Sequence, residues 1–130
     1  MENRRPQPLH VLIVTNEAAL GTLWQRHLER SGAVVEVTQT QDGAIDLLDR
    51  KPVDIVILNM ALEGGSALAV ADYAGFRCPG AKIISVTNSN FFSGGSVFAL
   101  LPNVCAQVTP TTPPDDIAAM VEHFGKPDQS

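Results

Sequence analysis

The sequence predicts a three-layer α/β domain built around a doubly wound sheet of five parallel strands. Five short apolar segments recur along the 130 residues, and a segment with helical spacing of apolar residues follows each of them. No hairpin signal joins two neighbouring strand segments. Parallel strands connected by right-handed helical crossovers are the arrangement that this alternation favours, with helices on both faces of the sheet.

The third strand, Val53–Asn59, is the clearest of the five. Its sequence VDIVILN is an apolar run without alternation, which is typical of a strand buried on both faces of a parallel sheet. Polar Asn59 ends the run, and a turn containing Glu63-Gly64-Gly65 follows. Because ligands in open α/β sheets bind beyond the carboxyl ends of the strands, the function should depend on Asn59 and its neighbours.

The first half of the chain supplies two further strands and two helices. We expect strands at Leu9–Val14 and Ala33–Thr38, the second at an edge of the sheet because its residues alternate in polarity. Asn16 stands where the first helix needs an N-cap residue. The second helix is expected over 41–51, since a proline follows.

The second half continues the same alternation. Ser66 is a candidate cap for a helix over Ala67–Phe76, and Lys82–Thr87 is expected to form the fourth strand. Residues 88–101 contain large apolar side chains around a Gly-Gly pair, which favours a short or irregular helix. Val104–Val108 is expected as the fifth strand, and a last helix follows Pro113-Pro114.

Composition indicates one domain. We expect a disordered N-terminal arm over 1–8, the folded domain over 9–124 and a frayed tail over 125–130.

The net charge of −5 and the scattered Lys and Arg argue against a nucleic-acid surface. No apolar run is long enough to span a membrane and no signal peptide is evident, so we expect a cytoplasmic protein. Cys78 and Cys105 lack the spacing of a metal site.

Five short motifs occur in register along this chain, and together they carry a family resemblance. They are Val11-Leu12-Ile13-Val14, Asp42-Gly43-Ala44, Asp54-Ile55-Val56-Ile57-Leu58, Val86-Thr87 and Val108-Thr109-Pro110. Over about residues 9–124 the chain resembles the receiver domain of two-component response regulators. The resemblance implies a flavodoxin-like fold with strand order 2-1-3-4-5 and a role in phosphorelay signal transduction.

The positions that carry chemistry in receiver domains differ in this chain. The acidic pair that holds Mg²⁺ in the family corresponds to Thr15 and Asn16, and the aspartate that accepts the phosphoryl group corresponds to Asn59. The family's lysine after strand five corresponds to Thr109, whereas its hydroxyl after strand four is retained as Thr87. These correspondences imply a degenerate phosphorylation pocket.

Such a pocket is not expected to catalyse phosphorylation. Phosphoryl transfer to a side chain needs a nucleophilic carboxylate and a cation that neutralises the developing charge. An Asn carboxamide is not such a nucleophile, and Mg²⁺ prefers sites with at least one or two carboxylates. The sequence therefore predicts a pseudo-receiver with no catalytic residue, no metal and no cofactor.

A non-catalytic receiver would act through contacts with a protein. By resemblance, the contact surface should include Phe91, Phe92, Phe98, Leu101 and Ala106, the last in the place of the family's aromatic switch residue. An exposed apolar patch there would fit a signalling kinase, a regulator, an output protein or a second copy in a homodimer.

Two alternatives remain open at this stage. The chain could accept a phosphoryl group on another residue, such as Asp54, Thr87 or Ser89. It could also bind a small anion or a nucleotide through the hydroxyls and amides of 87–90 and 109–112. The resemblance further implies a cis peptide bond between Thr109 and Pro110.

Overall fold

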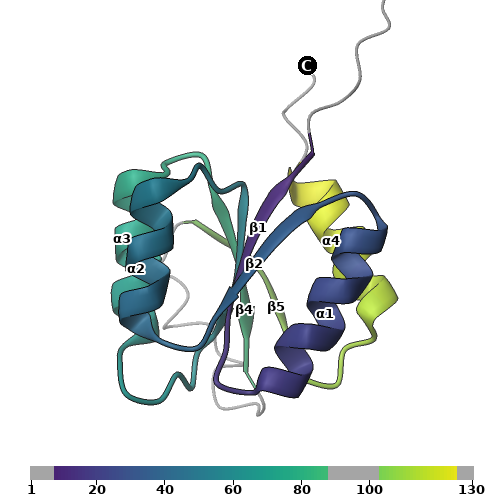
Figure 1. Cartoon of the computed structure of the whole chain (residues 1–130), viewed down its shortest axis with the longest axis horizontal. Helices are drawn as coiled ribbons and strands as arrows, with labels where there is room; N and C mark the ends of the chain where they lie inside the picture. The colour runs from purple at the N-terminus through teal and green to yellow at the C-terminus, as the bar shows by residue number, and fades with distance from the viewer. Residues whose placement is uncertain (1–7, 88–102, 126–130) are drawn as a thin grey trace, which may run out of the picture.

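A computed structural model describes residues 8–87 and 103–125 of the chain. Strands and helices alternate along these ranges, with β4 and β5 on either side of the residues that are not described (Figure 1). The strands are β1 (His10–Val14), β2 (Val34–Thr38), β3 (Ile55–Asn59), β4 (Lys82–Val86) and β5 (Val104–Val108). The helices are α1 (Ala18–Arg30), α2 (Gln41–Arg50), α3 (Ala67–Arg77) and α4 (Pro114–Gly125).

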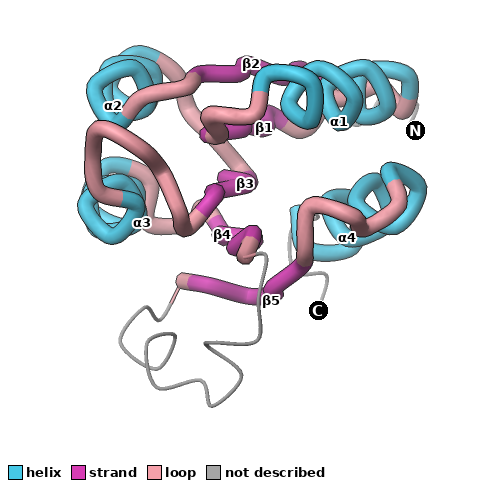
Figure 2. The backbone as a smooth tube through the Cα atoms, turned by 90° about the horizontal axis from the view of Figure 1, so that it is seen from below, coloured by secondary structure: helices cyan, strands magenta, loops and turns pink. Residues whose placement is uncertain are grey.

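The five strands form one parallel sheet in the order β2-β1-β3-β4-β5. This order and the three layers confirm the predicted fold class. Helices α2 and α3 cover one face of the sheet, while α1 and α4 cover the other (Figure 2). Strand β3 lies at the centre and all five of its residues are buried. Strand β2 forms an edge, as its alternating sequence indicated.

The sheet separates two apolar cores. Alternate residues of a strand point to opposite faces, so Ile13 joins the core beneath α1 and α4, whereas Val14 joins the core beneath α2 and α3. Trp24 is the largest side chain of the first core and is only 1% exposed. The second core receives small side chains such as Ala71 and Ala74, which allow α3 to approach the sheet closely.

The boundaries of the elements agree with the sequence prediction with a few differences. Ser66 caps α3, since its Oγ accepts a hydrogen bond from the backbone N–H of Ala69. Helix α4 includes Gly125, which we had assigned to the frayed tail; a Cβ there would lie 2.7 Å from Leu9, so the helix end packs tightly on the start of β1. The irregular helix expected over 88–101 lies outside the described residues.

No helix among the described residues has both the length and the apolar character that crossing a bilayer requires.

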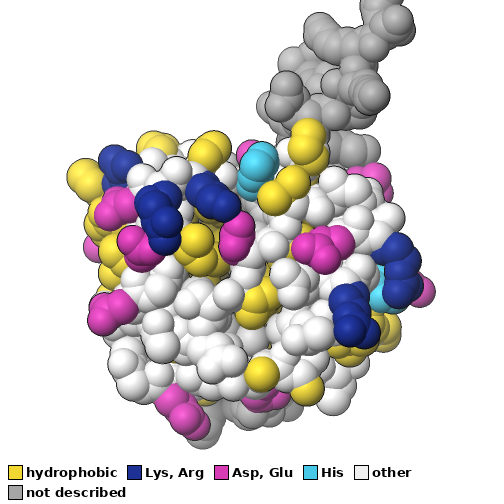
Figure 3. Space-filling view, in the orientation of Figure 1, with side chains coloured by type: hydrophobic (Ala, Val, Ile, Leu, Met, Phe, Trp, Pro, Cys, Tyr) yellow, Lys and Arg dark blue, Asp and Glu magenta, His cyan; other side chains and the backbone are white. Residues whose placement is uncertain are grey.

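Charged side chains of both signs alternate on the surface shown in Figure 3. Arg50 pairs with Asp46 along α2, and the ammonium of Lys51 lies 2.7 Å from the carboxylate of Glu36. Each of these exposed pairs contributes at most about 1 kcal/mol to stability.

A polar contact ties α2 to α3 at the surface. The Tyr73 hydroxyl donates a hydrogen bond of 2.6 Å to Oδ1 of Asp49, and the Arg77 guanidinium lies 3.0 Å from the same oxygen. The hydrogen bond to Asp49, followed by smaller effects of desolvation and of the Asp49 charge, raises the pKa of Tyr73 above its usual value.

Tyr73 is the only tyrosine of the chain, so its ionisation can be followed directly by ultraviolet absorbance. We expect Asp49→Ala to lower the pKa of Tyr73 toward the value of about 10 found in peptides, because the acceptor and its charge are removed. Asp46→Ala, on the same helix, should leave this pKa unchanged.

The same shift predicts a dependence of stability on pH. A raised folded-state pKa favours the neutral phenol, so the contribution of Tyr73 is complete below the unfolded-state pKa of about 10 and is lost as pH rises through the folded-state pKa. The Asp49→Ala variant should lack this loss. An equal alkaline decline of stability in the wild type and in the variant would contradict the assignment.

Candidate functional site

Three of the predicted site residues are buried at the carboxyl ends of adjacent strands. Asn59 ends β3, Thr15 follows β1 and Thr87 follows β4. Their side chains are 8%, 4% and 9% exposed, so their polar groups need partners within the protein. The ladder pairs Asn59 with Val86 and continues from β4 into the bond between the Thr87 N–H and the Val108 carbonyl.

The Asn59 carboxamide is hydrogen-bonded on both of its sides. Its Nδ2 donates to Oγ1 of Thr15 at 3.3 Å, and its Oδ1 accepts from the backbone N–H of Ala61 at 2.9 Å. The Thr15 hydroxyl oxygen also accepts from the backbone N–H of Glu17 at 3.1 Å. The Asn59 amide thus donates to one neutral partner and accepts from another, so these two bonds form without a charge at position 59.

Asn16 has a different role from the one predicted. It does not cap α1: the N-cap residue is Glu17, which makes no capping hydrogen bond through its side chain. Asn16 instead donates from Nδ2 to the carbonyl of Gln39 at 3.1 Å and accepts at Oδ1 from the N–H of Glu63 at 2.7 Å. One side chain therefore connects the segments that follow β1, β2 and β3.

The segment after β3 is held by a second contact that the sequence did not indicate. Oε1 of Gln41, at the start of α2, accepts from the backbone N–H of Ser66 at 2.8 Å. Gly65 lies so close to Gln41 that a Cβ there would come within 2.7 Å of it. Gly64 has φ +72°, a conformation that glycine adopts without strain. The two glycines therefore allow this turn to adopt its backbone conformation and to lie close to Gln41.

Thr109 lies apart from the hydrogen-bonded group. Its side chain is exposed, and its Oγ1 is 2.9 Å from Oγ1 of Thr111. The Thr109 carbonyl accepts from the N–H of Thr112 at 3.0 Å, which closes a β-turn with Pro110 at its second position. The Thr109 hydroxyl therefore makes its contacts within its own turn.

The predicted cis bond between Thr109 and Pro110 is wrong, because no cis peptide bond occurs among the described residues. The turn of 109–112 explains the difference. A proline in the second position of an ordinary β-turn follows a trans bond, whereas a cis proline belongs to the third position of another turn type.

The alternative phosphoacceptors gain no support. Asp54 lies at the amino-terminal end of β3, away from Asn59 at the other end of this strand. Its Oδ2 accepts a hydrogen bond of 2.9 Å from the backbone N–H of His10 and so fixes the start of β1. Thr87 is buried as described above, and Ser89 lies outside the described residues.

The residues of this pocket do not fit a magnesium ion. Mg²⁺ needs carboxylate oxygens in near-octahedral geometry, whereas the positions in question hold Thr15, Asn16 and Asn59, whose polar atoms already bind one another or the backbone. Within 8–87 and 103–125, no group of three or more His, Cys, Asp or Glu side chains could hold a metal ion.

The expected partner-binding surface can be located only in part. Ala106 lies in β5, is partly buried and packs against the core beneath α1 and α4. The other four residues of that prediction, Phe91, Phe92, Phe98 and Leu101, lie outside the described residues, so the surface stays a prediction.

Several solved structures of response regulator receiver domains have a fold similar to that of this chain, and so does a structure of an adenylate cyclase from Rhodopirellula baltica. A CheY-like receiver domain protein from Methanospirillum hungatei JF-1 matches with a TM-score of 0.80 and 21% identity over 90% of this chain and 93% of that chain. The non-phosphorylated HemR receiver domain from Leptospira biflexa matches with a TM-score of 0.80 and 17% identity over 95% and 98%.

A third similar structure is a complex with Mg²⁺ and BeF. It is the response regulator TrrA from Thermotoga maritima in complex with Mg²⁺ and BeF, with a TM-score of 0.76 and 21% identity over 89% of this chain and 98% of that chain. No family model matches the sequence, and the comparison with curated proteins gave no match. The structural similarities establish the fold.

The bond between Asn59 and Thr15 gives a test of the network. Thr15→Val keeps the shape of the side chain but removes the acceptor of the Asn59 amide, and leaving a buried donor without a partner costs about 1–3 kcal/mol. We expect urea unfolding to show a loss of this size. Thr111→Val, which removes a hydroxyl at an exposed turn, should change stability by less than about 0.5 kcal/mol.

A double-mutant cycle separates this bond from other effects of the substitution. If Asn59→Ala is introduced as well, the cost of Thr15→Val should fall, because the amide that needed the acceptor is gone. Additive losses would show that the two side chains do not interact.

Proposed function

We propose that this chain is a receiver-like signalling domain that works without phosphorylation, through contacts with a protein partner. The observation that carries the proposal is the state of Asn59. The residue proposed to stand in the acceptor position of the fold is an uncharged amide that donates one hydrogen bond and accepts one within the protein. A group in this state cannot act as the nucleophile of phosphoryl transfer.

The surrounding residues support the same conclusion. Loss of the acceptor charge removes the need for a cation, for the acids that would bind it and for a lysine that would contact the phosphoryl group. Thr15, Asn16 and Thr109 stand at those positions and use their polar groups in neutral hydrogen bonds. Because no step is left for the pocket to catalyse, the domain is proposed to act as a binding module and not as an enzyme.

The partner is proposed to be a signalling protein of the cell interior, namely a kinase, a regulator or an output protein, or else a second copy of the chain. The contact is proposed to involve the face to which β5 and Ala106 belong. A neutral pocket supports a constitutive contact, since neither a phosphoryl group nor a metal ion would be needed to set the shape of the domain.

The experiment is treatment with acetyl phosphate and Mg²⁺, followed by intact-mass measurement and by amide NMR spectra with Mg²⁺ and beryllofluoride. We expect no phosphoryl adduct and no shifts at Asn59 or Thr87. An adduct on any side chain of the wild type would overturn the proposal.

Restored variants make the negative result interpretable. The combined variant Thr15→Asp, Asn16→Asp, Asn59→Asp and Thr109→Lys restores the family's reactive set, and we expect it to gain an adduct that disappears without Mg²⁺. Asn59→Asp alone restores the nucleophile without the metal ligands and should remain unmodified.

A further inference from the structure

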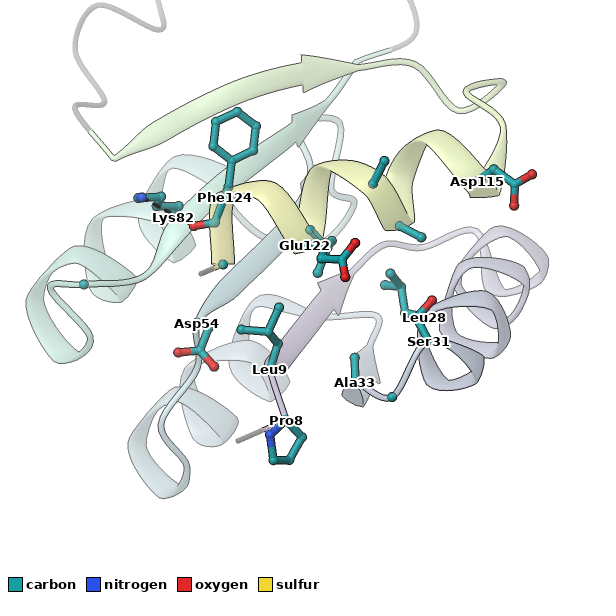
Figure 4. Close-up of a pocket in the computed structure, with 16 residues that line it drawn as sticks. Pro8, Leu9, Leu28, Ser31, Ala33, Asp54, Lys82, Asp115, Glu122 and Phe124 are labelled. Atoms are coloured by element: carbon teal, nitrogen blue, oxygen red, sulfur yellow. Dashed lines mark hydrogen bonds between the residues drawn. The ribbon is translucent and has the colours of Figure 1, made fainter. Parts of the chain in front are cut away.

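A groove of about 1330 Å³ lies at the end of the domain where the parallel strands begin. The group of Thr15, Asn59 and Thr87 lies at the other end, where the strands finish. Figure 4 shows that it is bounded by α4, by the end of α1 and by the start of β1. Leu9, Asp54 and Lys82, which precede or begin β1, β3 and β4, reach it from the sheet. The groove is therefore separate from Thr15, Asn16, Asn59, Thr87 and Thr109, none of which lines it.

The bottom of this groove is apolar, and many of the side chains that line it are small. Leu28 of α1 and Val121 of α4 are buried in the core beneath it, and Leu9 packs beside them. Small residues are prominent in its lining, beside the larger Pro8 and Phe124: Gly32, Ala33, Gly80, Ala118 and Ala119. Side chains of this size leave room for another chain to approach the floor closely.

The rim of the groove is acidic. Three carboxylates line it, from Asp54, Asp115 and Glu122, against the single ammonium of Lys82. Asp54 accepts from a backbone N–H, and Asp115 contacts Nε2 of His27 at 2.7 Å. Lys82 donates to the carbonyl of Phe124 at 3.4 Å, so its charge is directed to the end of α4.

The two acidic residues of α4 that line the groove are spaced so that both lie on one face of the helix. Asp115 and Glu122 are seven residues apart, which is about 10.5 Å along a helix, and both line the groove. Ala118 and Ala119 lie between them at the third and fourth positions. A helix that packs alongside α4 would therefore contact a carboxylate, then two alanines, and then a second carboxylate seven residues after the first.

We infer that this groove binds an amphipathic helix of a partner protein that carries Lys or Arg at two positions seven residues apart and large apolar residues at the third and fourth positions between them. Charge complementarity with the rim selects the basic residues, and the apolar floor selects the residues between them. The net charge of −5 would further favour the approach of a basic segment.

A second copy of this chain is a poorer occupant. In a two-fold symmetric contact the same surface meets itself, so the carboxylates of the two rims would face one another. The inference concerns a different edge of the domain and does not rest on the absence of phosphorylation.

The test is binding of a synthetic peptide with this pattern of two lysines and two leucines to the full chain, at a salt concentration of about 0.15 M, where only close charges interact strongly. A peptide of the same composition in shuffled order is the control. We expect amide shifts at Leu28, Ala119 and Glu122 with the first peptide only. Equal binding of both peptides, or shifts confined to other surfaces, would overturn the inference.

Variants of the groove make the test specific. Glu122→Gln together with Asp115→Asn should weaken binding roughly fivefold, because two exposed charge pairs are lost while the acceptor for His27 is kept. Ala119→Trp should abolish binding by filling the groove. Asp72→Asn, an exposed acid of α3 in the other helical layer, should leave the affinity unchanged.

Two outcomes would count against the inference even if the peptide binds. Equal affinity of the groove variants and Asp72→Asn would show that binding is not in the groove. Sedimentation that reveals dimers sensitive to Ala119→Trp would assign the groove to a second copy. Circular dichroism of each variant establishes that it is folded.

Discussion

The requirement that buried polar groups be hydrogen-bonded determines the structure at the carboxyl ends of the strands. Strand β3 ends with a polar side chain in a buried position, and such a group costs free energy unless every donor and acceptor finds a partner. The amide of Asn59 gains one bond from Nδ2 to Thr15 and one to Oδ1 from the backbone of Ala61. The loops around it then take the shapes that these bonds allow, and Asn16 extends the constraint from β2 to the turn before α3.

The fold followed from local patterns, because each strand and helix carries its own signal. The run VDIVILN identified the central strand, Ser66 identified the start of α3, and the limits of β5 agree with the structure at both ends. The alternation of strands and helices predicted parallel pairing, whereas the strand order came from the resemblance to receiver domains, and the sheet agrees with both.

The site was harder to predict because its contacts join distant parts of the chain. The sequence identified Thr15, Asn16 and Asn59 as one group, but it placed Asn16 as a helix cap, since a cap is the local use of that residue. Its real partners are 23 and 47 residues away. The turn at 109–112 was misjudged for a related reason: the cis bond was carried over from the resemblance, although the threonines of this chain form a turn of their own. The groove under α4 has no local signature, because its residues come from α1, α4 and the segments that lead into several strands.

The two helical layers also differ in their chromophores. The only tryptophan, Trp24, is buried beneath α1 and α4, while the only tyrosine, Tyr73, lies on α3 on the other side of the sheet. Because tryptophan can be excited at wavelengths where tyrosine does not absorb, the emission of Trp24 reports on one layer, and the ionisation of Tyr73 reports on the other. An optical recording of unfolding could show whether the layers separate from the sheet together or one after the other, with no label attached to the chain.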